Sequence, residues 1–516
     1  MNITSKYRSL SVQAKAALWF TICSFLQKGI SFITVPIFTR LMSTEEYGTY
    51  TVYLSWLQIL TIMTSLYLFN GVYDNAMAKY EKQRDEYTSA MQGLTLVITG
   101  AVFALYCFTS GFWEKILNLP KSMILLMFLE ALLSPALSYW SGRQRFEYRY
   151  RILVCVTILQ ALMNPIASLV LIRMNGGTAM MRILGIVGVQ ICIKANLQAL
   201  MNPIASLVLI RMNGGTAMMR ILGIVGVQVC ICVPIIVFQF CKGKEFFSKE
   251  YWGYALRIGI PIVPHYLSGI ILNQGDRIMI DKMVGKTEVA LYGLAYSIGM
   301  LVQLFISGMN SALTPWMYSK IKKGDIRSMR KVLQLLSVVV VGIAVALMLI
   351  SPELVLIFGS PKYREAVYVI PPVAASVFFI FIYNILSMPQ FYYEKTQFLM
   401  AASMAAAGAN VVLNFIFIRL FGYIAAGYTT LACYMLYSVG HYIVSKRILV
   451  NEGIQENLMN PGFLLACSVF LIGASIICNL IFPYRILRYA ILLASAGLVF
   501  WKKELLLKTM ADIRKK

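Results

Sequence analysis

The feature that most constrains this chain is a series of apolar runs, each roughly 20 residues long and nearly free of charge. An α-helix rises about 1.5 Å per residue, so each run matches the roughly 30 Å hydrocarbon core of a bilayer. Hydrophobic residues fill 59% of the 516 positions and charged residues only 13%, which is too little polar surface to cover a water-soluble core. The pattern therefore predicts helices that span a membrane.

We expect an all-α polytopic, multi-pass membrane protein with about 14 transmembrane helices. The expected spans are 16–39, 48–70, 89–112, 122–140, 152–172, 218–240, 258–280, 289–313, 332–350, 366–388, 397–418, 423–444, 461–482 and 486–501.

The distribution of Lys and Arg among the loops predicts the orientation of these spans. With the N-terminus inside, a dense basic set at 320–331 and a basic tail at 502–516 fall on the cytoplasmic side, while the outward loops are short and less basic. Both termini are therefore expected in the cytoplasm. The same bias accounts for the formal charge of +24, which forms no continuous arm or face for nucleic acid.

Residues 159–190 recur without a change as residues 197–228, a tandem duplication with an offset of 38 residues. Copies this similar indicate a recent duplication or an assembly error rather than a structural repeat. One added span would send the basic set at 320–331 outward, and Lys194 would cost about 2.5–3.5 kcal/mol at the bilayer centre. We expect one extra hydrophobic segment that is non-spanning or re-entrant and turns near Lys194.

Charged residues at membrane depth are the first candidates for function, because burying them costs free energy. Lys28 lies in the middle of the first expected span, too far from either interface to reach it easily. It is either a cation in a water-filled cavity that awaits a phosphate, or one partner of a buried ion pair with Glu130 of the fourth span.

The seventh span contains an acid, a base and amides within two turns, among them Asn273, Asp276, Arg277 and Asp281. Arg277 and Asp281 are four residues apart and could form a helical ion pair. Alternatively, Arg277 is a bidentate contact for phosphate or sugar and Asp276 is a proton or cation site. His265 of the same span is a candidate for ion coupling as a proton relay, although a hydrogen-bonded packing role is its simpler interpretation.

Other polar residues and prolines in the spans have a packing role as their simplest interpretation. Asn410 and Asn414 could bond across helices or contact cargo, and His441 is expected to be a hydrogen-bonded packing residue. The prolines of the spans are expected to bend them, as in discontinuous transporter helices: Pro36, Pro165, Pro261, Pro264, Pro371 and Pro372. The sequence shows no hydrolase triad, Walker loop or metal quartet, so we expect no catalytic residue, no metal site and no ATP-driven pump.

Several stretches resemble the polysaccharide and O-antigen flippase family of the multidrug/oligosaccharidyl-lipid/polysaccharide exporter superfamily. The resemblance lies in 36–48, in 273–280 followed by 288–296, in 394–396, and in Asn410, Leu413-Asn414 and 419–430. Their order and spacing cover nearly the whole chain.

The resemblance implies two six-helix lobes, at 1–240 and 251–446, and a trailing helix pair with a basic cytoplasmic tail at 461–516. It implies alternating access by a flippase in the inner (cytoplasmic) membrane of a bacterium, which moves undecaprenyl-pyrophosphate-linked oligosaccharide outward for capsule, O-antigen, lipopolysaccharide or exopolysaccharide synthesis. An ion gradient or the membrane potential would drive it, without a cofactor. Membrane lipids, a polysaccharide polymerase and a chain-length regulator are the implied partners.

We therefore expect two sets of site residues. The substrate-binding set is Lys28, Arg277, Asn273, Asn410 and Asn414, and the ion-coupling set is Asp276, Glu130 and His265.

Two other classes of membrane protein share parts of this pattern. An integral-membrane polysaccharide polymerase or ligase would normally carry a sizeable outer loop, whereas every outward loop here is short. A drug/cation antiporter of the same superfamily would favour acidic groups in its cavity, whereas Lys28 suits anionic cargo.

Overall fold

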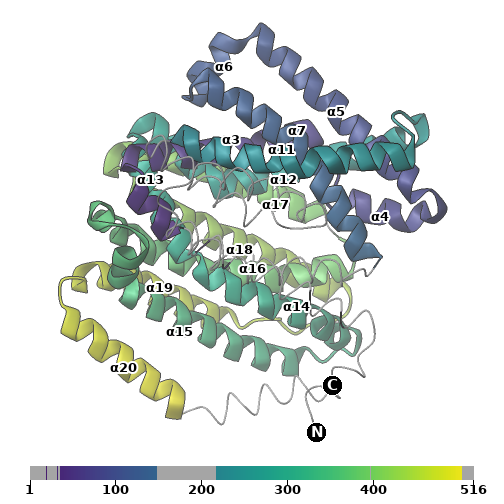
Figure 1. Ribbon diagram of the computed structural model, residues 1–516. Helices are drawn as coiled ribbons and strands as arrows, with labels where there is room; N and C mark the ends of the chain where they lie inside the picture. The colour runs from purple at the N-terminus through teal and green to yellow at the C-terminus, as the bar shows by residue number, and fades with distance from the viewer. Residues whose placement is uncertain are drawn as a thin grey trace, which may run out of the picture. The chain divides into compact units, whose positions relative to one another are not determined.

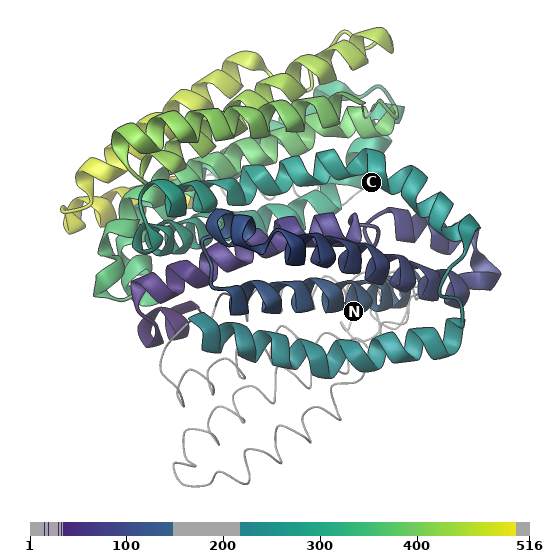
Figure 2. The ribbon, with the colours of Figure 1, turned by 90° about the horizontal axis from the view of Figure 1, so that it is seen from above.

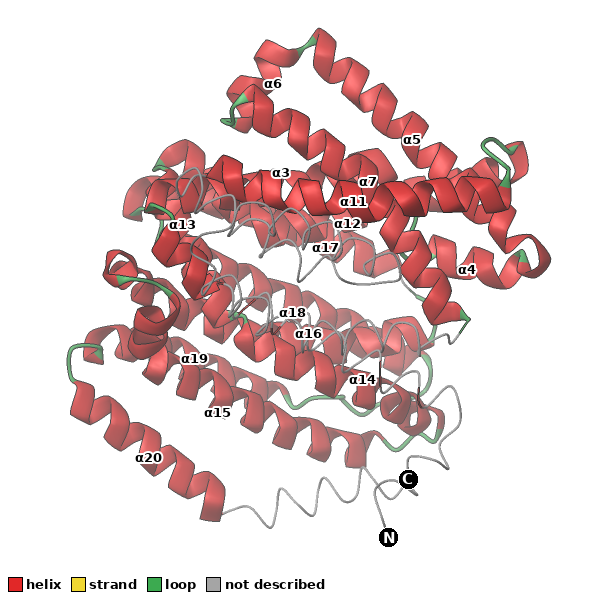
Figure 3. Cartoon of the chain, in the orientation of Figure 1, coloured by secondary structure: helices red, strands yellow, loops and turns green. Residues whose placement is uncertain are grey.

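The computed structural model describes residues 35–147, 217–395 and 397–501, together with the single positions Lys15, Trp19, Gly29 and Phe32. The regular secondary structure of this described part is helical, and loops and turns connect the helices, as Figure 3 shows. Eight of its helical segments are long and apolar enough to cross a bilayer, and the chain is an integral membrane protein of the all-α class expected from the sequence.

The described part of the N-terminal half contains long helices joined by shorter helical segments. They are α3 (Thr44–Ser65), α4 (Val72–Lys79), the 3-10 turn η1 (Glu81–Gln83), α5 (Arg84–Phe108), α6 (Ser110–Leu117), α7 (Lys121–Phe146) and α11 (Ala217–Gly243). The longest helix, α12 (Lys249–Met283), follows them.

The C-terminal half is made of longer helices that follow one another closely. They are α13 (Lys286–Gly299), α14 (Leu301–Lys322), α15 (Ile326–Phe358), η3 (Pro361–Val369), α16 (Ile370–Tyr392), α17 (Gln397–Phe421), α18 (Ala425–Asn451), α19 (Pro461–Ile481) and α20 (Arg485–Trp501).

The chain divides into two compact units, Met1–Leu267 and Ser268–Lys516, with the division inside α12. In the first unit, α3, α5, α7 and α11 pack against one another as a bundle, which the purple, blue and dark teal ribbons of Figure 2 follow. Close backbone approach helps to join this bundle: a Cβ added at Gly243 of α11 would lie 2.3 Å from the carbonyl oxygen of Asp85 in α5. Only glycine fits at such a contact.

Helix α16 is the core of the second unit. It packs against α13, α14, α15, α18 and α19, and the most apolar stretch of Pro361–Tyr392 is 89% buried, more than in any other candidate span of the described residues. Figures 1 and 2 show α15, α16, α18 and α19 running side by side, with α20 laid along α15. A helix apolar on every face is stable only when neighbours surround it, which explains the hydrophobic sequence of α16.

The expected spans from 48–70 to 122–140 and from 218–240 onward each have a helical counterpart. Spans 16–39 and 152–172 lie largely outside the described residues, so the number of 14 stays a prediction. The span expected at 289–313 is interrupted after Gly299, where α13 ends and α14 begins two residues later. Glycine is a poor helix former, and a Cβ at Gly299 would lie 2.6 Å from Val373 of α16.

Pro371 and Pro372 mark the start of α16 rather than a position inside an α-helix. They lie in the first turn of α16, where the backbone N–H that proline lacks has no partner inside a helix. The residues before them form the 3-10 segment η3 rather than the start of the span.

Only the end of the duplicated region falls in the described part of the chain. Residues 217–228 of the second copy form the first half of α11 and pack into the first unit. The first copy and the predicted turn near Lys194 lie outside the described residues.

Candidate functional site

A buried carboxylate, Asp276 of α12, is the centre of a polar cluster inside the second unit. Its side chain is 0% exposed among helices that are otherwise apolar. A buried charge is stable only with partners, so its surroundings determine what it can do.

Three side chains on three different helices donate hydrogen bonds to Asp276. The Tyr292 hydroxyl of α13 lies 2.5 Å from Oδ2, the Thr430 hydroxyl of α18 lies 2.7 Å from Oδ2, and the Asn414 amide of α17 lies 2.6 Å from Oδ1. Because all three groups donate, they stabilise the ionised carboxylate within the protein interior. The cluster thus joins four helices around one carboxylate.

Two further polar groups extend the cluster along α17 and α18. The second Asn414 N–H donates to Asn410 Oδ1 at 3.0 Å, an arrangement made possible because residues four apart share one face of a helix. The Thr429 hydroxyl donates to Asn414 Oδ1, and it also lies 3.0 Å from the Ala426 carbonyl. Carboxylate, amide and hydroxyl oxygens are the ligands that hard cations prefer.

Asn273 lies one turn before Asp276 on the same helix and is bonded to two aromatic hydroxyls. Its Oδ1 accepts from Tyr434 of α18 at 3.0 Å and from Tyr296 of α13 at 3.2 Å, and its amide donates to the Gly269 carbonyl at 2.7 Å. Asn273 therefore fixes α12 against α13 and α18 next to the carboxylate.

The Arg277 guanidinium lies 4.4 Å from the centre of the Tyr296 ring, a cation–π contact that orients its plane. Its Nη1 donates to the Asn273 carbonyl at 2.6 Å and to Gln274 Oε1 at 2.8 Å. Among the residues that the structure describes, Arg277 makes no ion pair, so the Arg277–Asp281 pair considered from the sequence does not form. The cationic charge of Arg277 is thus not neutralised by a close carboxylate contact.

The first unit holds a second buried carboxylate, Glu130 of α7, which is 7% exposed. Its Oε2 accepts from the Tyr53 hydroxyl of α3 at 2.9 Å, and its Oε1 accepts from the Gln228 amide of α11 at 2.8 Å. Each unit therefore contains one membrane-depth carboxylate that is bonded to a tyrosine and to an amide. Lys28, the partner weighed for Glu130, lies outside the described residues.

The two histidines lie in different surroundings. His265 of α12 belongs to the first unit, is half-buried, and has its ring centre 5.8 Å from that of Tyr266. His441 of α18 is buried, and its Nδ1 lies 2.7 Å from the Gln390 amide nitrogen, in line with the expected packing role.

The structure brings together Asn273, Asp276, Arg277, Asn410 and Asn414 from the expected set. It adds Tyr292, Thr430 and Tyr434 to the cluster, and Gln228 beside Glu130. A tyrosine or threonine in an apolar helix gives no signal of its own, because either is common at helix contacts. Only the positions of Thr430 and Tyr292 inside stretches that resemble the flippase family pointed toward them.

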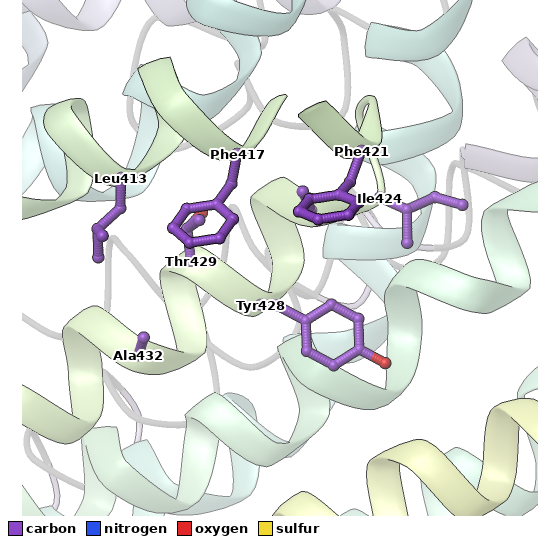
Figure 4. Close-up of a pocket in the computed structure, with 8 residues that line it drawn as sticks. Leu413, Phe417, Phe421, Ile424, Tyr428, Thr429 and Ala432 are labelled. Atoms are coloured by element: carbon purple, nitrogen blue, oxygen red, sulfur yellow. The ribbon is translucent and has the colours of Figure 1, made fainter. Parts of the chain in front are cut away.

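An apolar pocket of about 560 Å³ lies between α17 and α18 beside this cluster (Figure 4). Phe417, Phe421 and Tyr428 line it, and the Phe417 and Phe421 rings stack with centres 6.1 Å apart. Thr429 is at once a lining residue and a donor to Asn414. The pocket therefore suits a hydrocarbon chain, and one polar residue separates it from the cluster.

Among the described residues, no three His, Cys, Asp or Glu side chains gather as a metal site would require. The described cysteines are free thiols. The Asp276 cluster is made of one carboxylate with amide and hydroxyl partners.

The profile of the polysaccharide biosynthesis protein family matches residues 14–322, and that of the MatE family matches residues 261–416. Among curated proteins, 172 residues are 28% identical to "Lsg locus putative protein 1" of Haemophilus influenzae, which covers 31% of this chain and 41% of that protein. The match spans about two fifths of the length of the curated relatives.

Solved structures with the same fold include "Lipid II flippase MurJ, inward closed conformation". That comparison has a TM-score of 0.64 at 14% identity and covers 95% of this chain and 100% of the other. A second, the inward-facing conformation of a multidrug resistance MATE family transporter of the MOP superfamily, has a TM-score of 0.56 at 13% identity over 83% of this chain and 96% of that chain. At this level of identity the likeness concerns the fold alone.

Proposed function

Because this chain belongs to the polysaccharide biosynthesis protein family, we propose that it is a flippase for lipid-linked oligosaccharide. Its cargo is an undecaprenyl-pyrophosphate-linked repeat unit, which moves from the cytoplasmic to the outer leaflet of the inner membrane by alternating access. The product serves the synthesis of a surface polysaccharide such as capsule, O-antigen of lipopolysaccharide, or exopolysaccharide. Both termini face the cytoplasm.

The observation that carries this proposal is that an acid, Asp276, and a base, Arg277, occupy adjacent positions of α12 and point in different directions. Successive helix residues point about 100° apart, so the carboxylate turns into the unit while the guanidinium lies over Tyr296. Arg277 has N–H groups beyond the one bonded within α12, and a planar guanidinium suits the oxygens of a pyrophosphate. Asn273, Asn410 and Asn414 hold the two charges in place or contact the sugar.

Asp276 is the coupling group of this mechanism, and no resident cofactor takes part. Its three donors suit the ionised form, and proton or cation binding would remove the negative charge and weaken those hydrogen bonds. Such a change alters the packing of α12 on α13, α17 and α18, the kind of two-state element that alternating access needs. Glu130 would act in the same way in the first unit, with Lys28 as a further contact for phosphate.

The membrane potential supplies energy in the same direction. Moving one negative charge outward across an inside-negative potential releases about 2.3 kcal/mol per 100 mV. A pyrophosphate-linked cargo carries more than one such charge. A polysaccharide polymerase and a chain-length regulator would act on the product at the outer leaflet.

A transport assay on inverted vesicles loaded with labelled lipid-linked oligosaccharide tests this function. Arg277→Gln should slow transport about tenfold or more, because a charge-assisted hydrogen bond contributes about 1.5–3 kcal/mol and 1.4 kcal/mol is tenfold. Asp276→Asn should abolish the response to an imposed ion gradient while cargo binding persists. Arg419→Gln is the matched control, since Arg419 is an exposed arginine in the same unit, stacked on Phe415.

Wild-type vesicles that transport no lipid-linked saccharide would reject the proposed function. Equal rates for Arg277→Gln and Arg419→Gln would reject the site alone.

A second candidate function is drug or cation antiport, which the MatE family match over residues 261–416 favours. That segment contains Asp276, and a buried acid suits cationic cargo. Efflux of a cationic dye from cells that express the chain, lost in Asp276→Asn and unchanged in Arg277→Gln, would support antiport instead.

A further inference from the structure

An apolar groove of about 270 Å³ lies between α16, α18 and α19 in the second unit. Its lining includes Phe379 and Ile382 of α16, Val439 and Tyr442 of α18, and Leu464 of α19. Val439 is 55% exposed, so the groove opens to the outside of the unit, where the surroundings are lipid. The groove begins at Pro461, the first residue of α19, and therefore lies near the membrane face at which that helix starts.

Two exposed cations lie on α18 directly beyond this groove. Lys446 follows Tyr442 by four residues and so shares its helix face, and Arg447 is next to it. Within the described part of the chain, neither side chain makes an ion pair. The sequence assigns this face of the membrane to the cytoplasm.

Neighbouring basic residues at the same end behave differently, because acids neutralise them. Lys395 bonds to Glu452 at 2.9 Å, and Arg330 pairs with Glu456 at 3.7 Å while donating to the Asn457 carbonyl at 2.7 Å. Glu452 and Glu456, the acids of the α18–α19 connection, are therefore already paired with Lys395 and Arg330. Among the described residues, Lys446 and Arg447 therefore keep their positive charge without an acidic partner, one turn of α18 beyond Tyr442 of the groove.

We propose that the α16–α18–α19 groove and the Lys446–Arg447 pair form a binding site for an anionic phospholipid in the membrane leaflet at which α19 begins. The groove takes an acyl chain, and the two cations take the phosphate headgroup at the interface. This combination matches an amphiphile whose charge and chain are joined end to end, whereas a soluble anion would leave the groove empty. A basic residue near an anionic membrane surface contributes attraction that falls off within a Debye length.

This lipid site is separate from the Asp276 cluster. Lys446 follows Thr430 by 16 positions on α18, which places the two about 24 Å apart along the helix axis. A lipid bound there contacts α18 and α19 and does not occupy the Asp276 cluster. The inference goes beyond the proposed function and does not depend on it.

The test uses the full chain, purified in detergent, and measures retention of phosphatidylglycerol and phosphatidylcholine by native mass spectrometry. The wild type should retain phosphatidylglycerol in preference. Lys446→Gln with Arg447→Gln should weaken that preference about tenfold, whereas Val439→Trp should fill the groove and lower retention of both lipids. The matched control is Lys362→Gln with Arg364→Gln. These residues are an exposed Lys and Arg in η3, the segment that follows the C-terminal end of α15.

Three results would overturn the proposal. The first is equal retention of the two lipids by the wild type, or an unchanged preference in the Lys446/Arg447 variant. The second is displacement of phosphatidylglycerol by millimolar inorganic phosphate, which would indicate a site for a soluble anion. The third is displacement by undecaprenyl diphosphate at equal concentration, which would make the groove part of the cargo path.

Discussion

Replacing Gln228 with leucine removes one of the two hydrogen bonds that Glu130 accepts from described residues, with little change in side-chain volume. The lost bond is 2.8 Å long, and both residues are buried, at 3% and 7% exposure. A hydrogen bond to a charged group contributes about 1.5–3 kcal/mol, and the carboxylate oxygen left behind is buried without its donor. A unit of the size of Met1–Leu267 shifts by about 2 °C per kcal/mol, so we expect the thermal midpoint of the purified protein to fall by roughly 3–6 °C.

The tandem duplication supplies a control for this substitution inside the same chain. Gln190 occupies the same position in the first copy, with identical residues for the whole repeat before it. Gln190→Leu leaves the bond between Gln228 and Glu130 intact, so it should not cause this loss. Thermal unfolding of both variants, and of each in a Glu130→Leu background, isolates the contribution of the hydrogen bond.

Two results would refute this reasoning. Equal destabilisation by Gln190→Leu and Gln228→Leu would mean that the second copy does not uniquely complete the first unit. A Gln228→Leu effect that is unchanged in the Glu130→Leu background would mean that the loss comes from packing rather than from the bond to the carboxylate.

Two other substitutions test the packing of the second unit by thermal unfolding. Arg488→Met should cost about 1.5–3 kcal/mol, because both of its terminal nitrogens bond to Glu353 at 2.8 Å, and Glu353→Met in addition should recover part of the loss by leaving no unpaired charge. Gly299→Ala should cost about 1–3 kcal/mol through its clash with Val373, whereas Gly342→Ala, where a Cβ meets nothing within 4 Å, should be neutral or stabilising. Similar midpoints for the Gly299 and Gly342 variants would contradict the close contact between α13 and α16.

The resemblance to a flippase family, stated from short stretches such as 273–280 and 419–430, agrees with the family match over residues 14–322. The matching stretches of the sequence contain Asp276 and the three side chains that donate hydrogen bonds to it, Tyr292, Asn414 and Thr430. The sequence did not show that Arg277 stacks on Tyr296 rather than pairing with Asp281. The spacing of four residues within α12 permits the Arg277–Asp281 pair, whereas the contact with Tyr296 forms because α13 lies alongside α12.

The sequence by itself determined that the chain spans a membrane, because run length and hydropathy are local properties that the bilayer selects directly. It also indicated which polar residues deserve attention, since any charge at membrane depth is costly. Only the tertiary structure decided which groups meet. Tyr292, Asn414 and Thr430 lie 16, 138 and 154 residues from Asp276 in the chain, and packing of four helices brings them onto one carboxylate. Such partners have no local signature, because the free energy that selects them arises from burying one charge among distant donors.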